Sequence, residues 1–190
     1  TEGGNHVFDS VSRWSWNGVS LSQCGTLVAT LSPPDGDECW VRSVITGEVV
    51  NKWKIGYNAE GVLFSPHRQC SSNGSKMEGR ECGESEKEDM RVLTFSDKCI
   101  SMWKVANGEC VMKIEKEERI ADKCIFSPNG DMIASFSYLH DDCYVWDVQT
   151  GKCISHIRVK RATDIERNVI GVTDIAFSPH STSHIPISSS

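Results

Sequence analysis

The chain has 190 residues, a formal net charge of −6 and 38% hydrophobic residues. This length is enough for one domain with a sizeable core, and the composition argues against disorder over the whole chain. The negative charge argues against nucleic acid or an anionic membrane as the main partner, and no apolar run approaches the roughly 20 residues that span a bilayer.

The first predicted element is a pair of short strands at 19–32, VSLSQCGTLVATLS. Apolar residues alternate with polar ones on both sides of Gly25, which is typical of strands joined by a turn. The same pattern returns at 124–137, CIFSPNGDMIASFS, with Gly130 at the turn. Partial copies of these runs are VLFSP at 62–66, VLTFS at 92–96 and IAFSP at 175–179.

A second kind of element consists of an alternating strand, a glycine turn and another alternating strand. The glycines suit such turns because positive φ costs them little. Together with the first element, this pattern predicts four short antiparallel strands in a unit of about 43 residues, which is typical of a β-propeller blade. The three copies are CWVRSVITGEVV at 39–50, ISMWKVANGECV at 100–111 and CYVWDVQTGKCI at 143–154, with Gly47, Gly108 and Gly151 at their turns.

These units resemble WD40 repeats. Trp146-Asp147 is the dipeptide of that family, Trp103 is followed by Lys104 instead, and the first unit has neither residue. The resemblance implies an all-β fold, an incomplete WD40-type β-propeller with about three four-stranded antiparallel blades and part of a fourth. Because each blade has two apolar faces that need a neighbour, the remaining blades are expected outside this chain. The repeats cover approximately 17–57, 58–118 and 119–157, with a partial repeat at 172–190.

Two segments depart from the repeat. Residues 67–90 form a polar insertion, which is either a tolerated solvated loop or a regulatory or partner-binding loop. Its His67, Cys70 and Cys82 lack the C-x-x-C spacing of a zinc site, so we expect no metal there. Residues 156–171 form a long charged connector between blades, which is either an exposed excursion or a small basic contact patch. The patch would consist of Arg158, Lys160 and Arg161.

The Gly-His dipeptide that often precedes a WD40 unit is missing throughout this chain. In the family, this histidine joins a buried hydrogen-bond network with a strand Ser or Thr, a loop Asp and the Trp. By resemblance, the third unit keeps Ser135 or Ser137, Asp141 or Asp142, and Trp146. Without the histidine we expect the network to be incomplete and to stabilise the fold less.

The nine cysteines are numerous for this length. Free cysteine behaves as a small buried hydrophobe, and disulfide frameworks usually belong to smaller secreted domains. We therefore expect packed free thiols in a reducing compartment, cytoplasmic or nuclear. The cysteines in or beside apolar β-rich runs are Cys39, Cys99, Cys110, Cys124, Cys143 and Cys153.

The candidate functional residues lie at the rims of the predicted blades. We find no nucleotide-binding, zinc-protease or nucleophile-elbow motif, and we expect no catalysis, metal or cofactor. In WD40 proteins, partner peptides often meet the residue four positions before the Phe of the first strand. Carried over to this chain, those positions are Asn17, Glu60, Asp122 and Thr173. Two acids among them favour a basic peptide, although all four could equally be ordinary polar loop residues.

The sequence therefore predicts a non-catalytic protein–protein interaction scaffold whose partner is a protein or peptide. Its cysteine-rich blades also resemble the WD40 tails of animal NACHT or NB-ARC proteins, which implies a sensing or autoinhibitory module of a larger signalling protein. One alternative is a substrate-recruiting subunit of an enzyme complex, such as a ubiquitin ligase. Another is a propeller enzyme with convergent acids, histidines or metal ligands in its channel.

Overall fold

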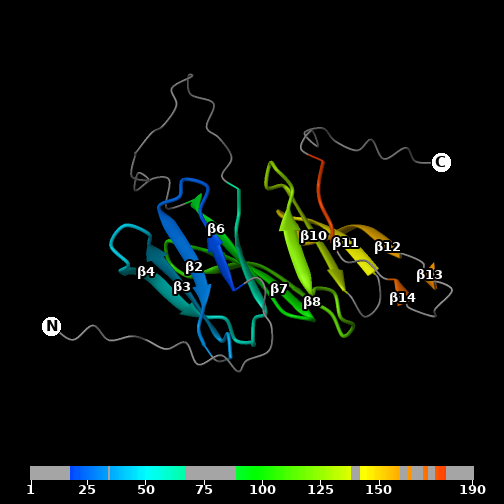
Figure 1. The fold of residues 1–190 in the computed structure, drawn as a ribbon, viewed down its shortest axis with the longest axis horizontal. Coiled ribbons are helices and arrows are strands. Elements are labelled where there is room, and N and C mark those ends of the chain that lie inside the picture. The colour runs from blue at the N-terminus through cyan, green and yellow to red at the C-terminus, as the bar shows by residue number, and fades with distance from the viewer. Residues whose placement is uncertain are drawn as a thin grey trace, which may run out of the picture.

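The computed structural model has an all-β architecture built from three four-stranded antiparallel sheets and one two-stranded ladder (Figure 1). In each large sheet, every strand pairs with the next strand in the chain. The prediction of an all-β fold with four-stranded antiparallel units is confirmed. The structure describes residues 18–33, 35–66, 89–137, 142–158, 162–163, 169–170 and 174–178.

The strands of the three large sheets follow one another along the chain. Sheet 1 contains β1 (Val19–Leu21), β2 (Leu27–Leu31), β3 (Glu38–Ser43) and β4 (Val49–Lys54). Sheet 2 contains β5 (Gly61–Phe64), β6 (Arg91–Phe95), β7 (Cys99–Lys104) and β8 (Cys110–Glu115). Sheet 3 contains β9 (Lys123–Phe126), β10 (Met132–Ser137), β11 (Asp142–Asp147) and β12 (Cys153–Arg158). The short ladder is formed by β13 (Ala162–Thr163) and β14 (Val169–Ile170).

The last two strands of each sheet share the same local geometry. Gly47, Gly108 and Gly151 occupy their turns with φ of 72°, 70° and 66°, which a residue with a Cβ rarely adopts. A register shift then occurs at the same place in all three ladders, beside Arg42, Trp103 and Trp146. These three positions are therefore structurally equivalent. Residues of different sheets are equivalent when they are the same number of residues along the chain from these positions.

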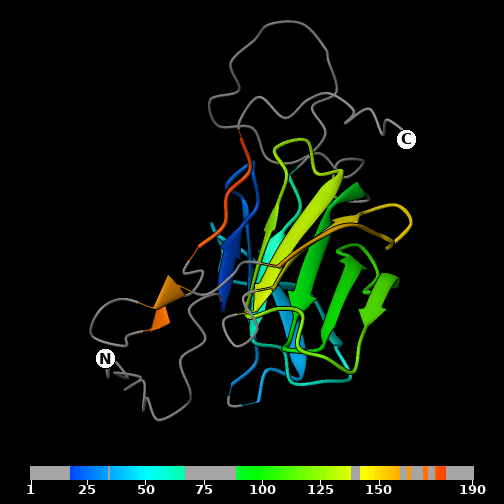
Figure 2. The same cartoon turned by 90° about the vertical axis from the view of Figure 1, so that its right-hand side faces the viewer.

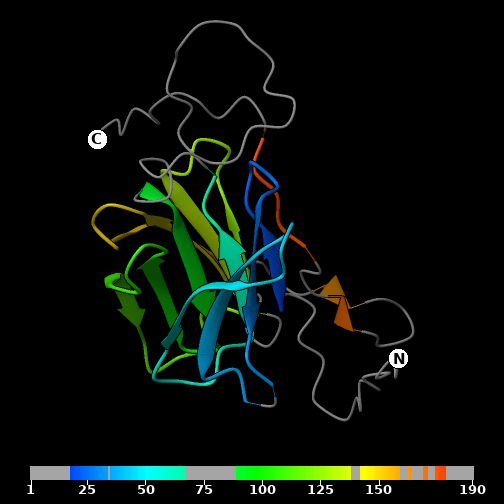
Figure 3. The same ribbon diagram turned by 90° about the vertical axis from the view of Figure 1, so that its left-hand side faces the viewer.

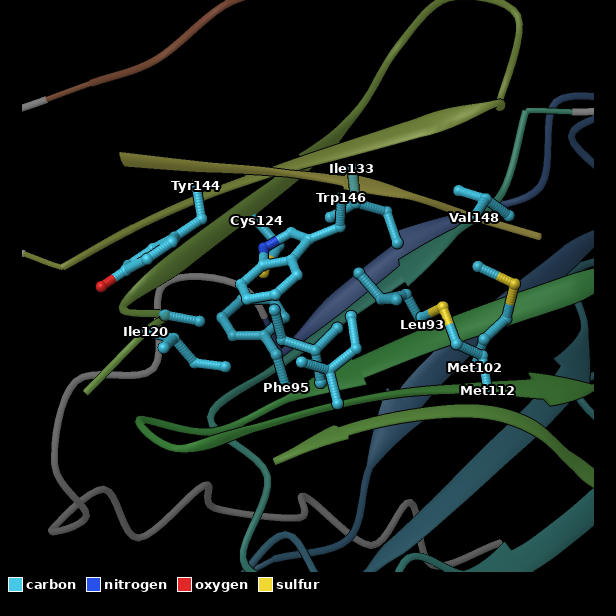
Figure 4. Close-up of a cluster of buried hydrophobic side chains, with 13 residues drawn as sticks. Leu93, Phe95, Met102, Met112, Ile120, Cys124, Ile133, Tyr144, Trp146 and Val148 are labelled. Atoms are coloured by element: carbon cyan, nitrogen blue, oxygen red, sulfur yellow. The ribbon is translucent and has the colours of Figure 1, made fainter. Parts of the chain in front are cut away.

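The sheets stack face to face, and two hydrophobic cores fill the spaces between them. We call the face of a sheet that points toward the preceding sheet its near face, and the opposite face its far face. Val92 and Trp103 on the near face of sheet 2 belong to the first core, with Val41 of sheet 1. Figure 4 shows the second core, where Met102 on the far face of sheet 2 packs with Trp146 of sheet 3. Sheet 2 is consequently apolar on both faces.

The first strands of the three sheets lie at one edge of the stack, with β5 in contact with both β1 and β9. The backbone N–H of Phe64 in β5 donates to the Ser20 hydroxyl of β1 at 2.9 Å. The views from the side of sheet 3 (Figure 2) and of sheet 1 (Figure 3) show the sheets standing next to one another around this edge. The described residues form no closed barrel, and the arrangement is that of an incomplete propeller.

The strand cysteines differ in burial, which partly corrects the expectation that most of them are packed. Cys39, Cys99 and Cys124 are buried and Cys143 is intermediate, but Cys110 and Cys153 are exposed. Both exposed residues begin the outermost strand of their sheet, and the outermost strands β4 and β12 are largely accessible to solvent. Alternating sequence predicts a strand but does not tell whether the strand lies inside or at the edge of a sheet.

Candidate interaction surface

One end of the stacked sheets is built from the connectors between units and the loops between second and third strands. We call it the connector end. The connectors cover 55–60 and 116–122. The backbone N–H of Glu60 donates to the Phe95 carbonyl at 2.7 Å, and that of Ile120 donates to the Asp97 carbonyl at 2.6 Å. Each connector is therefore hydrogen-bonded through its backbone to the end of sheet 2.

Two of the predicted partner-binding residues meet at this end. Arg119 Nε lies 3.0 Å from Asp122 Oδ1, and Arg119 Nη2 lies 3.7 Å from Glu60 Oε1. The closer contact is an ion pair without the geometry of a directional hydrogen bond. Glu60 precedes the first strand of sheet 2, and Asp122 precedes that of sheet 3. Equivalent positions of two neighbouring units therefore form one surface, with Arg119 between them.

The net effect of this cluster is to raise the pKa of the Glu60 carboxyl. Burial raises the pKa of the Glu60 carboxyl, and the charge of Arg119 opposes this rise. The neighbouring carboxylates of Asp97 and Asp122 raise the pKa of Glu60 further. Half of the Glu60 side chain still faces solvent, with 46% exposure, whereas that of Asp122 is 12% exposed. Glu60 is thus the carboxylate that a molecule arriving from solution would meet first.

Of the other predicted partner residues, the structure describes only Arg158. Asn17, Lys160, Arg161 and Thr173 lie outside the described residues. Arg158 belongs to β12, and its Nε donates to Asp142 Oδ1 at 3.1 Å. Its side chain is 73% exposed, so the guanidinium remains accessible from solvent.

Asp142, at the start of β11, gathers a polar and aromatic cluster around it. His156 Nε2 lies 3.2 Å from the same oxygen that Arg158 contacts. The His156 ring stacks on Tyr144 with centroids 4.4 Å apart, and Tyr144 stacks on Trp146 at 5.4 Å. The sequence analysis proposed Asp141 or Asp142 for the structural network. Asp141 lies outside the described residues, and Asp142 contacts His156 and Arg158 of β12.

In the second and third repeats, the tryptophan of the third strand is held by a hydroxyl of the second strand. Trp146 Nε1 donates to Ser135 at 2.9 Å, and Trp103 Nε1 donates to Thr94 at 2.8 Å. Ser137, the other candidate for the third unit, is buried and its hydroxyl has no partner among the described residues. In sheet 2 the network has a third member that the sequence analysis missed, since the Tyr57 hydroxyl lies 2.8 Å from that of Thr94.

The repeat turns are stabilised by bonds within each turn. The Asp147 carboxylate accepts from the backbone N–H and the hydroxyl of Thr150, both at 2.7 Å. These bonds lower the pKa of the Asp147 carboxyl. In sheet 2 the corresponding turn is closed by Lys104 and Glu109 at 2.7 Å. Asp147, the second residue of the Trp-Asp dipeptide that supports the family resemblance, therefore stabilises the turn here.

The described part of the chain contains no group of three His, Cys, Asp or Glu side chains that could hold a metal ion. The buried thiols are poor nucleophiles because burial raises the pKa of Cys39 to about 12 and raises those of Cys99 and Cys124 as well. Among the same described residues there is no helix with the length and apolarity needed to cross a bilayer.

Comparison with known proteins adds no assignment. The chain matches no protein-family model, and no curated protein is significantly similar to it in sequence.

Proposed function

We propose that this chain is part of a WD40-type β-propeller and acts as a non-catalytic scaffold for protein–protein interaction. The internal repeats, the four-stranded units and the tryptophan–hydroxyl bonds in two of the sheets support the family resemblance. The buried, protonated thiols suit a reducing compartment such as the cytoplasm. In the proposed function, the connector end contacts the partner and further blades complete the ring.

The observation that carries this proposal is the meeting of Glu60 and Asp122 on one rigid surface. These carboxylates come from different units, and both lie on connectors that are hydrogen-bonded to sheet 2. A preformed surface loses little conformational entropy when a partner binds. Because Glu60 remains half exposed, a lysine or arginine of the partner can approach its carboxylate and share it with Arg119. The favoured partner is a protein or peptide with basic side chains.

The test measures binding of a fluorescein-labelled peptide of alternating lysine and serine by fluorescence polarisation. The double variant Glu60→Lys, Asp122→Lys should weaken binding by roughly tenfold or more, because both attractive charges become repulsive. The matched control is the double variant Glu48→Lys, Glu109→Lys, which makes the same charge change in the turns that follow β3 and β7, at the opposite end of the strands. Equal binding by the wild type and the double variant, or equal loss in the control, would contradict the proposed surface.

A further inference from the structure

The near face of sheet 1 lacks the cover that the near faces of sheets 2 and 3 have. Val44, Val105 and Val148 are equivalent residues, each two positions after the register shift of its sheet. The exposed fraction is 2% for Val105 and 8% for Val148, but 48% for Val44. The preceding sheet covers this valine in sheets 2 and 3. The exposure of Val44 therefore shows that none of the described sheets packs on sheet 1 at this position.

The turn glycines show the same difference. A Cβ added to Gly108 would lie 2.9 Å from the Cβ of Trp53, and one added to Gly151 would lie 3.4 Å from Met112. Both contacts are to the outermost strand of the preceding sheet. A Cβ added to Gly47 would meet nothing within 4 Å. The turn of sheet 1 is therefore shaped like the other two, but none of the described strands lies against it.

The far face of sheet 3 is the complementary surface. Ile157 of β12 is 52% exposed, whereas its equivalent in β8, Ile114, is 6% exposed because sheet 3 packs on it. The interface between sheets 1 and 2 also contains a side-chain hydrogen bond. Asn51 Nδ2 of β4 donates to the Val105 carbonyl of sheet 2 at 2.8 Å. On the far face of sheet 3, Ser155 is equivalent to Asn51 and also has a donor group. On the near face of sheet 1, Val44 is equivalent to Val105.

We propose that these two faces bind each other between two copies of this chain. The far face of sheet 3 in one copy would pack on the near face of sheet 1 in the other, and the reverse contact would form on the other side. This contact continues the interface that the chain already forms twice internally. Two copies place six sheets in the ring, within the range of roughly four to eight blades that propellers use. The inference depends on the stacking of the sheets and not on the partner-binding surface.

The segment 174–178 must move when the copies join. It lies beside the first strand of sheet 3, where Asp174 Oδ1 pairs with Lys123 Nζ at 2.6 Å, and β1 of the second copy would approach the same edge. This segment forms no strand and belongs to none of the sheets, so a complete sheet can displace it. Weakening the ion pair with Asp174→Asn should therefore favour the two-copy state.

The first experiment measures mass by sedimentation equilibrium over a range of protein concentrations. We expect a species of twice the chain mass of 21.1 kDa at high concentration. Val44→Glu and Ile157→Glu should each raise the dissociation constant by roughly tenfold or more, since each buries a charge in the contact. Both residues are exposed in the single chain, so neither change disturbs its fold, which circular dichroism checks.

Matched controls lie one or a few residues away. Ile45 is 71% exposed, but its equivalents Ala106 and Gln149 are exposed too, so this position faces no neighbouring sheet. Ile154 is 46% exposed, and its equivalent Val111 is also exposed, at 37%. Ile45→Glu and Ile154→Glu should therefore leave the two-copy species unchanged. Equal effects of the test and control variants would show nonspecific association and overturn the proposal.

Mixing the two test variants provides a further check. A Val44→Glu copy retains a normal far face on sheet 3, and an Ile157→Glu copy retains a normal near face on sheet 1. At a concentration where each variant alone is mostly monomeric, the mixture should recover a two-copy species through one unaltered interface. No recovery on mixing would overturn the proposal. A wild-type chain that stays monomeric at all concentrations, or one that forms open assemblies larger than two copies, would also overturn it.

Discussion

The hydroxyl of Tyr57 lies 2.8 Å from the hydroxyl of Thr94, which also accepts the indole N–H of Trp103 at 2.8 Å. Tyr57 also donates to the Thr94 backbone carbonyl at 3.0 Å. Thr94 is completely buried, and burial raises the pKa of Tyr57 above its ordinary range. The connector between sheets 1 and 2 is thereby tied to the near face of sheet 2, close to the Glu60 carboxylate that we assign to partner binding.

Replacing Tyr57 with Phe should lower the free energy of unfolding by about 1 to 2 kcal/mol, because buried hydroxyl and carbonyl groups lose a partner. Tyr144→Phe is the matched control, since its hydroxyl makes only a 3.4 Å contact to Glu118. Urea unfolding followed by tryptophan fluorescence measures both variants. A loss in Tyr57→Phe no larger than that in the control would show that the Tyr57 bonds contribute little.

The repeats predict the strands and turns because alternation and glycine spacing depend on local sequence. The same reasoning proposed Ser135 or Ser137 as the partner of Trp146, and the structure selects Ser135. Tyr57 and Arg119 were missed because they lie in connectors, which have no repeated pattern. Their roles arise from contacts between sheets, and such contacts depend on how the units stack rather than on the sequence of any one unit.

A second prediction concerns the close approach of β5 and β6. A Cβ added to Gly61 would overlap the ring of Phe95, which is completely buried in the second core. Gly61→Ala should therefore lower the free energy of unfolding by about 1 to 3 kcal/mol through overpacking. In a double-mutant cycle, Phe95→Leu should reduce the cost of the added methyl group. Additive effects of the two substitutions in urea unfolding would argue against this steric cause.

The thiols should react in two groups. Cys110 and Cys153 are exposed and should be labelled by iodoacetamide in the native protein, although burial of the Cys110 sulfur raises its pKa and slows its reaction. Cys39, Cys99 and Cys124 are buried, and their raised pKa values keep them protonated, so they should be labelled only after unfolding. Peptide mass spectrometry assigns each site. Native labelling of Cys39 as rapid as that of Cys153 would contradict the packing of the first core.

The last prediction concerns acid stability and the cluster around Asp142. Burial by itself raises the pKa of this carboxyl, but hydrogen bonds and charges from Arg158 and His156 outweigh burial, so the net pKa lies below its ordinary value of 3.8. A carboxyl with a lowered pKa in the folded state stabilises the fold above its unfolded pKa. That contribution is lost as the pH falls through the folded pKa. Asp142 should therefore contribute to acid unfolding below about pH 4.

Asp142→Asn should lower stability at neutral pH and make the free energy of unfolding less dependent on pH below about pH 4, since the side chain no longer titrates. The double variant His156→Gln, Arg158→Gln keeps the buried carboxyl but removes its partners. Its folded pKa should rise, and acid unfolding should begin at a higher pH than in the wild type. Circular dichroism during acid titration measures both effects. An unchanged acid midpoint in the double variant would show that these two side chains do not hold the Asp142 carboxylate in its ionised form.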